Sequence, residues 1–87
     1  MIIDEHEALI EQIAASEGEY VLQRDYEALE GQVFVLLHQC AEKPVLAPIP
    51  LEALPATPGS MMSHPVMSKP GLDVYRSNAA LIRAALG

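Results

Sequence analysis

The sequence contains one cysteine, one phenylalanine and no tryptophan among its 87 residues. The single thiol of Cys40 excludes an internal disulfide framework and leaves too few ligands for a cysteine-rich zinc site. No uninterrupted apolar run approaches the roughly 18–20 residues that a transmembrane helix needs. The N-terminal stretch also lacks the basic and apolar segments of a secretory signal. We therefore expect a cytoplasmic protein, or a component of a cytoplasmically assembled complex.

Basic side chains are scarce, with five Lys and Arg against twelve Asp and Glu, for a net charge of −7. Residues 1–43 hold ten of the acidic side chains but only Arg24 and Lys43 as basic ones, whereas residues 44–87 have a slight positive balance. An acidic surface repels phosphate backbones and anionic lipid, so we expect neither nucleic acid nor membrane as a partner. The acidic half is either a solvated helix face or a surface that attracts basic groups.

The most regular pattern runs from residue 22 to residue 40, where apolar side chains recur at spacings of four and three. This heptad seam predicts a helix over about 22–41 that packs lengthwise on another helix. The apolar run 33–37 is rich in β-formers, so a strand after Gly31 is the alternative. The seam continues through that run without a slip, which favours the helix. The seam residues are Leu22, Tyr26, Leu29, Val33, Leu36 and Cys40.

A first helix is predicted over about 4–17. Asp4 and Glu7 have the spacing of a capping box, which satisfies amide groups at a helix start. Gly18 can take the left-handed conformation that ends a helix. Together with the seam helix, this segment is expected to form an acidic helical hairpin. His6, in the first turn, is expected at the surface.

A last helix is predicted over about 73–86, with Asp73 as its cap and several alanines as strong helix formers. Arg76 and Arg83 are seven residues apart and therefore share a face of that helix. We expect these arginines to pair with carboxylates of the acidic hairpin. The candidate partners are Glu27 and Glu30.

All seven prolines fall within residues 44–70. Proline lacks an amide donor and biases the preceding residue toward extended backbone, so the segment is predicted to be an extended arm without a long helix or central strand. Its many apolar residues argue against a disordered linker. The expected fold is mainly α, in one small domain. It consists of the acidic helical hairpin (1–43), the proline-rich apolar arm (44–70) and the C-terminal helix (71–87).

The sequence carries no catalytic signature, since phosphate-binding glycine loops, nucleophile elbows and zinc spacings are all lacking. Methionines and a histidine gather in a short cluster that suits Cu(I), although such methionines more often fill an apolar groove. The cluster consists of Met61, Met62, His64 and Met67. His38 and Cys40 lie two apart on the predicted helix and so point in different directions. We expect no catalytic, cofactor or metal site, and no enzyme.

Two kinds of function fit these observations. The first is a non-enzymatic structural or assembly protein, such as a minor component of a virion, that binds a partner or itself through the helical seam and the apolar arm. The second is a soluble acidic regulator (an inhibitor, antitoxin or chaperone) that masks a basic protein surface. The residues expected to make the contact are Leu22, Tyr26, Leu29, Val33, Phe34, Leu36, Leu37, Ile49, Leu51 and Leu54.

Overall fold

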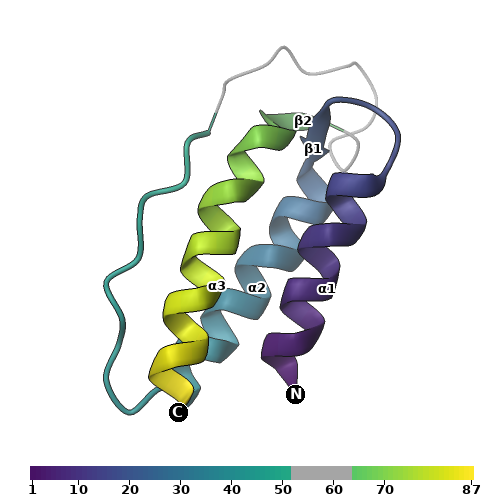
Figure 1. Ribbon diagram of the computed structural model, residues 1–87. Helices are drawn as coiled ribbons and strands as arrows, with labels where there is room; N and C mark the ends of the chain where they lie inside the picture. Colours follow the sequence, from purple (N-terminus) through teal and green to yellow (C-terminus); the bar gives the residue numbers. More distant parts are fainter. Residues whose placement is uncertain (52–63) are drawn as a thin grey trace.

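Three helices make up most of the protein (Figure 1). The computed structural model describes residues 1–51 and 64–87. The prediction of a mainly α fold is confirmed. The helices are α1 (Ile2–Ala15), α2 (Gln23–Gln39) and α3 (Leu72–Leu86).

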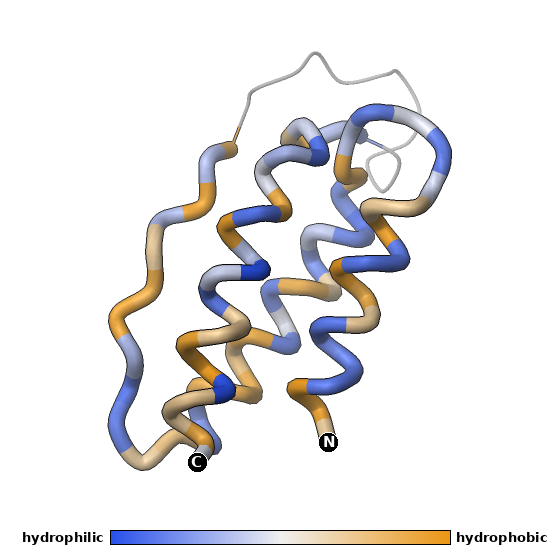
Figure 2. The backbone as a smooth tube through the Cα atoms, in the orientation of Figure 1, coloured by the Kyte–Doolittle hydropathy of each residue, from blue (hydrophilic) through white to orange (hydrophobic). Residues whose placement is uncertain are grey.

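Helices α2 and α3 run in the same direction, and α1 runs antiparallel to both (Figure 1). The two termini therefore lie at one end of the bundle, and the connection between α1 and α2 lies at the other. Polar and apolar residues alternate along each helix (Figure 2), as expected where one face is buried. The run 33–37 is helical, within an α2 whose bounds differ by one or two residues from the predicted 22–41.

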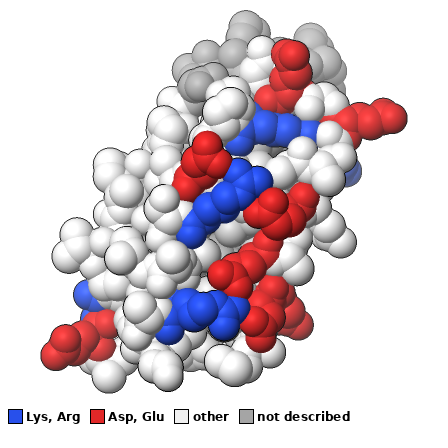
Figure 3. All heavy atoms as spheres, in the orientation of Figure 1, with Lys and Arg blue, Asp and Glu red and all other residues white. Residues whose placement is uncertain are grey.

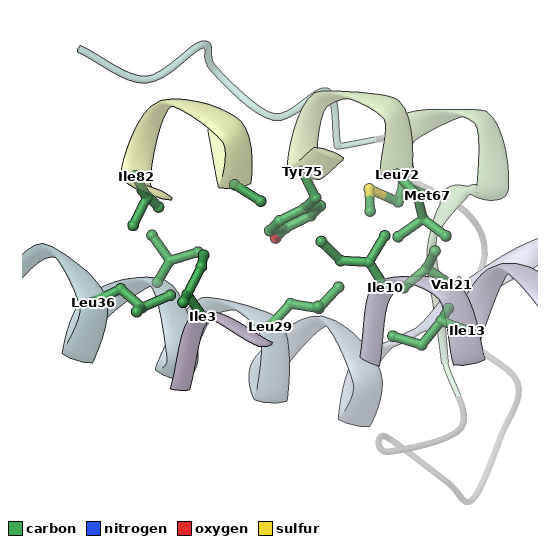
Figure 4. Close-up of a cluster of buried hydrophobic side chains, with 12 residues drawn as sticks. Ile3, Ile10, Ile13, Val21, Leu29, Leu36, Met67, Leu72, Tyr75 and Ile82 are labelled. Atoms are coloured by element: carbon green, nitrogen blue, oxygen red, sulfur yellow. The ribbon is translucent and has the colours of Figure 1, made fainter. Parts of the chain in front are cut away.

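The apolar faces of the helices meet in one core (Figure 4). The seam of α2 contributes Leu29 and Leu36, both fully buried, together with Val33. Tyr75 projects into the core from α3 and is also fully buried. The core residues are Ile3, Ile10, Ile13, Val21, Leu29, Val33, Leu36, Met67, Leu72, Tyr75, Ala79 and Ile82. The predicted packing seam is thus used within the chain.

A short two-stranded sheet covers the core at the end where α1 connects to α2. Strand β1 (Tyr20–Leu22) pairs antiparallel with β2 (Pro65–Ser68), with Val21 opposite Met67 and an irregularity after Val21. Both Val21 and Met67 are fully buried. The sequence pattern missed this sheet because strands of three or four residues are too short to show alternation. A proline at the first position of a strand is tolerated, but it makes the segment look unlike a strand in the sequence.

The predicted extended arm is present in the described residues that follow α2. Its described part runs from the end of α2 to Leu51, alongside α3 and without helix or strand (Figure 1). The predicted range 44–70 is wrong at its C-terminal end, where β2 and the 3₁₀ turn η1 (Lys69–Gly71) take its place.

The arm provides the return connection that two parallel helices require. Helix α2 ends at the far side of the bundle from the start of α3, so the chain has to travel back along the bundle (Figure 1). A helix of 17 residues, such as α2, is about 25 Å long. A stretch of eight residues with polyproline geometry, the length of 44–51, covers about 25 Å as well. A proline-rich sequence suits this role because it cannot collapse into a helix.

The predicted capping box at the start of α1 is wrong. Helix α1 begins at Ile2, before Asp4, and has no side-chain cap. Asp4 and Glu7 instead accept hydrogen bonds from Arg83 of α3. Asp4 and Glu5, in the first turn, still interact favourably with the positive end of the helix dipole.

The other predicted helix ends also need correction. Helix α3 begins without a side-chain cap, and Asp73 accepts a hydrogen bond from Arg76 rather than capping the helix. Helix α1 ends at Ala15, so Gly18 does not terminate it directly. Gly18 does have the expected positive φ, 91°, in the loop that turns the chain toward β1.

Candidate protein-contact surface

The seam residues that were expected to bind a partner lie in the chain's own core. Leu29 and Leu36 are fully buried, and Val33 is 8% exposed. The other predicted contact residues on this side of α2 are half-buried: Leu22, Tyr26 and Leu37. The seam does pack lengthwise on helices, but those helices belong to the same chain.

The predicted contact residues of the arm are divided between its two sides. Ile49 is half-buried and packs against the core, as does Leu46. Leu51 is 59% exposed and Val45 is 92% exposed. Leu54 lies outside the described residues. The arm therefore keeps one apolar side on its own bundle and presents another to solvent.

The most exposed large apolar side chain of α2 is on the side opposite the seam. Phe34, the one phenylalanine of the chain, is 64% exposed, and its neighbour Val35 is 40% exposed. They belong to a stripe of exposed residues that recur at spacings of three and four, the period of one helix face. We call this stripe the outward face of α2. It consists of Glu27, Ala28, Gly31, Phe34, Val35 and His38.

Phe34 and His38 form a fixed pair on the outward face. Their ring centroids are 4.4 Å apart with the planes tilted by 46°. His38 Nδ1 donates a 2.9 Å hydrogen bond to the carbonyl oxygen of Phe34, which orients the imidazole. Cys40 points elsewhere, with its thiol donating to the Leu36 carbonyl at 3.3 Å. His38 and Cys40 therefore bond to different backbone carbonyls, those of Phe34 and Leu36.

Gly31 lies in the middle of the outward face. A Cβ built at Gly31 meets no atom of the described residues within 4 Å, so residues 1–51 and 64–87 leave room for a side chain there. Glycine is about 1 kcal/mol less favourable than alanine in a helix interior. The absence of a side chain at Gly31 leaves the helix backbone accessible at this point of the outward face.

Two arginines of α3 join it to α1. Arg76 Nε donates to Glu11 at 2.8 Å, and Arg83 Nη2 donates to Asp4 at 2.6 Å. Figure 3 shows basic side chains lying between acidic ones on this face of the molecule. The hydrogen bonds from Arg83 and Arg76 hold the pKa of Asp4 and of Glu11 below their ordinary values, because they favour the charged carboxylates.

The predicted pairing of these arginines with Glu27 and Glu30 is wrong, because α1 and not α2 lies beside them. Glu30 instead accepts a 2.6 Å hydrogen bond from the Tyr75 hydroxyl. Burial of the phenol, helped by this hydrogen bond, raises the pKa of Tyr75. Glu27 remains exposed on the outward face, where Gln23 Nε2 donates to it at 2.9 Å.

His6 is fully buried, contrary to the expectation that it lies at the surface. Its Nδ1 donates to Gln32 Oε1 at 2.8 Å, and its ring meets Tyr75 edge to face with centroids 6.2 Å apart. Its Nε2 has no partner in the described part of the chain. The signal that could have found it is spacing, because His6 lies three residues after Ile3 and four before Ile10 on the buried face.

Asn78 attaches the arm to α3. The Ala47 amide donates to Asn78 Oδ1 at 3.0 Å, and Asn78 Nδ2 donates to the Ala47 carbonyl at 3.2 Å. The asparagine is only 2% exposed. The described part of the arm therefore packs on its own chain. This role is not predictable from the sequence, because an asparagine within a helix gives no sign of a distant partner.

Within residues 1–51 and 64–87, no group of three or more His, Cys, Asp and Glu side chains could hold a metal ion. Of the methionine and histidine cluster, Met67 is fully buried in the core and its sulfur lies 3.1 Å from where a Cβ on Gly71 would stand. Met61 and Met62 lie outside the described residues. Met67 thus has the packing role that methionine commonly has.

Two open grooves flank the connection between α1 and β1, with volumes of about 420 and 510 Å³. Both are lined by Gly18, Glu19 and Tyr20. Lys69, which also lines the smaller groove, donates to the Ser16 carbonyl and is therefore engaged within the chain. The larger groove is also lined by Glu17, Arg24 and Asp25.

No protein-family model, curated protein or solved structure matches this chain. Among the described residues, no helix is long and apolar enough to cross a membrane.

Proposed function

We propose that this protein is a non-enzymatic assembly module of the cytoplasm, or of a complex assembled there, that binds protein through the outward face of α2. The observation that carries the proposal is the 64% exposure of Phe34 on a helix whose opposite face already fills the core. The proposed contact surface is therefore not the seam but the opposite side of the same helix.

The composition of the outward face supports this proposal. Phenylalanine is enriched in the centres of protein interfaces, whereas charged residues are depleted there and lie at the rim. Phe34 and Val35 form such an apolar centre, and Glu27 lies about two turns away along the helix. Gly31 provides the small surface against which a partner's side chain can pack.

The exposed side of the arm offers a second, smaller apolar surface. Val45 is almost fully exposed, and Leu51 is more than half exposed. Both lie on the arm, which runs from the end of α2 alongside α3 (Figure 1). We propose that this surface extends the contact in a large assembly, as the sequence analysis expects of the arm.

An acidic regulator that masks a basic surface is the second candidate, favoured by the net charge of −7. It has weaker support because several carboxylates are already paired with arginines of the same chain. These paired carboxylates are Asp4, Glu7, Glu11 and Asp73. Binding by charge weakens steeply with salt, whereas apolar contact does not.

The test is co-purification of the tagged chain from cells that express it naturally, with washes at about 1 M NaCl. We compare the wild type with Phe34→Ser and with Leu81→Ser, a control on α3 where Leu81 is 45% exposed. The wild type and Leu81→Ser should retain bound protein at high salt, and Phe34→Ser should lose it. Equal retention by Phe34→Ser, or loss of all bound protein at high salt, would contradict the proposal.

A further inference from the structure

Two pairs of residues on the outward face of α2 are related by one point along the helix. Gly31 and Phe34, a missing side chain and a large one, lie one turn apart on this face. Glu27 and His38 lie on either side of them. The two pairs share the same midpoint along the helix, between residues 32 and 33.

A two-fold axis through that midpoint, perpendicular to the helix, brings a second α2 against the first in antiparallel orientation. Each residue then faces the residue on the opposite side of the midpoint, as in any isologous contact. Phe34 of each copy lies over Gly31 of the other. Glu27 of each copy faces His38 of the other.

We propose that a second copy of this chain occupies the outward face, in an antiparallel α2–α2 contact about this axis. The inference rests on the proposed function and specifies its partner. Self-complementarity is what a second copy requires, because one surface has to provide both halves of every contact. A partner of another kind could bind Phe34 or Gly31 alone. Only a second copy requires these two residues to lie at positions that the two-fold axis exchanges.

The close approach of the two helices depends on Gly31. Helix axes in contact lie about 8–10 Å apart, with the distance set by the side chains at the contact. Because a Cβ at Gly31 projects into open space, an alanine there would occupy the volume that Phe34 of the second copy fills. The fold itself tolerates alanine, which is the better helix former.

The polar contact between the two copies depends on Glu27 and His38. His38 uses Nδ1 for the Phe34 carbonyl, so Nε2 is the nitrogen that can face Glu27 of the second copy. Antiparallel helices also place the positive end of each helix dipole beside the negative end of the other. A contact made by one helix from each copy falls at the small end of specific interfaces, so we expect a dissociation constant on the order of micromolar.

The test is sedimentation equilibrium of the purified chain over a wide concentration range. The wild type should form dimers, and Phe34→Ser and Gly31→Ala should each raise the dissociation constant at least about tenfold. Gly31→Ala should do so while raising the urea midpoint of unfolding, which separates contact from folding. Leu81→Ser should dimerise like the wild type.

A charge exchange tests the antiparallel register. Glu27→Lys should weaken the dimer, and Glu27→Lys combined with His38→Glu should restore it. A wild-type chain that stays monomeric at every concentration would overturn the second-copy proposal, and the co-purification experiment would then still decide the proposed function. A dimer that is insensitive to Gly31→Ala, or that the charge exchange does not restore, would overturn this arrangement.

Discussion

Asn78 of α3 binds both backbone polar groups of Ala47 in the arm. Its Oδ1 accepts from the Ala47 amide at 3.0 Å, and its Nδ2 donates to the Ala47 carbonyl at 3.2 Å. One buried side chain thus fixes the position of the return segment between α2 and α3. Because the contact is made with backbone atoms, it depends on the extended conformation of the arm rather than on a particular side chain at residue 47.

Asn78→Ala should release the arm while leaving the helices folded. The substitution removes both hydrogen bonds between Asn78 and the Ala47 backbone, a loss of about 1–3 kcal/mol. Amide hydrogen exchange read by NMR should show the Ala47 amide exchanging much faster, with core amides such as that of Leu36 less affected. Unchanged protection of Ala47 would show that Asn78 does not hold the arm.

Opposite faces of α2 should respond differently to substitution. Leu36→Ala should lower the free energy of unfolding by about 2–5 kcal/mol, because it opens a cavity at a fully buried site. Phe34→Ser should change it by less than about 0.5 kcal/mol, since the side chain is mostly in solvent. Urea unfolding of dilute protein measures both. A large loss of stability in Phe34→Ser would mean that Phe34 serves the fold.

The arginine pairs between α3 and α1 should make stability fall in acid. The pKa of Asp4 is lowered in the folded state by the hydrogen bond from Arg83, so its contribution is present above the unfolded pKa and is lost as the pH falls below about 4. Arg83→Gln should reduce the difference between urea midpoints measured at about pH 7 and about pH 3. Arg24→Gln, an exposed control on α2, should leave that difference unchanged.

Tyr75 should make stability fall in alkali. Its pKa is raised in the folded state, first by burial and then by the hydrogen bond to Glu30, so the folded state favours the neutral phenol. This contribution is complete below the unfolded pKa of about 10 and is lost as the pH rises above it. Tyr75→Phe should be less stable by about 1–2 kcal/mol at neutral pH. Its urea midpoint should also fall less than that of the wild type between about pH 8 and about pH 11. Parallel losses in both proteins would contradict this assignment.

The sequence predicts those parts of the fold that depend on local periodicity. The seam from Leu22 to Cys40 identifies α2, and its continuation through 33–37 correctly favours helix over strand. The density of prolines correctly predicts an extended segment after α2. These features follow from one stretch of chain at a time, which is why they are readable without the structure.

The remaining features depend on which elements become neighbours. Arg83 pairs with Asp4 rather than with a carboxylate of α2, because α1 lies beside that face of α3. The helices start without caps, so the capping rules misplace their ends. The apolar seam indicates a partner helix but not whether it comes from the same chain. Only the packed structure shows that the seam is internal and that Phe34 is left exposed.

We propose that the outward face of α2 contacts protein in the cell. The most direct measurement is photo-crosslinking in cells that express the protein naturally, with a photoreactive amino acid at position 35, beside an intact Phe34, or at position 81 on α3. Our account predicts crosslinked protein from position 35 and little from position 81. Crosslinking from position 81 alone, or none from position 35, would contradict it.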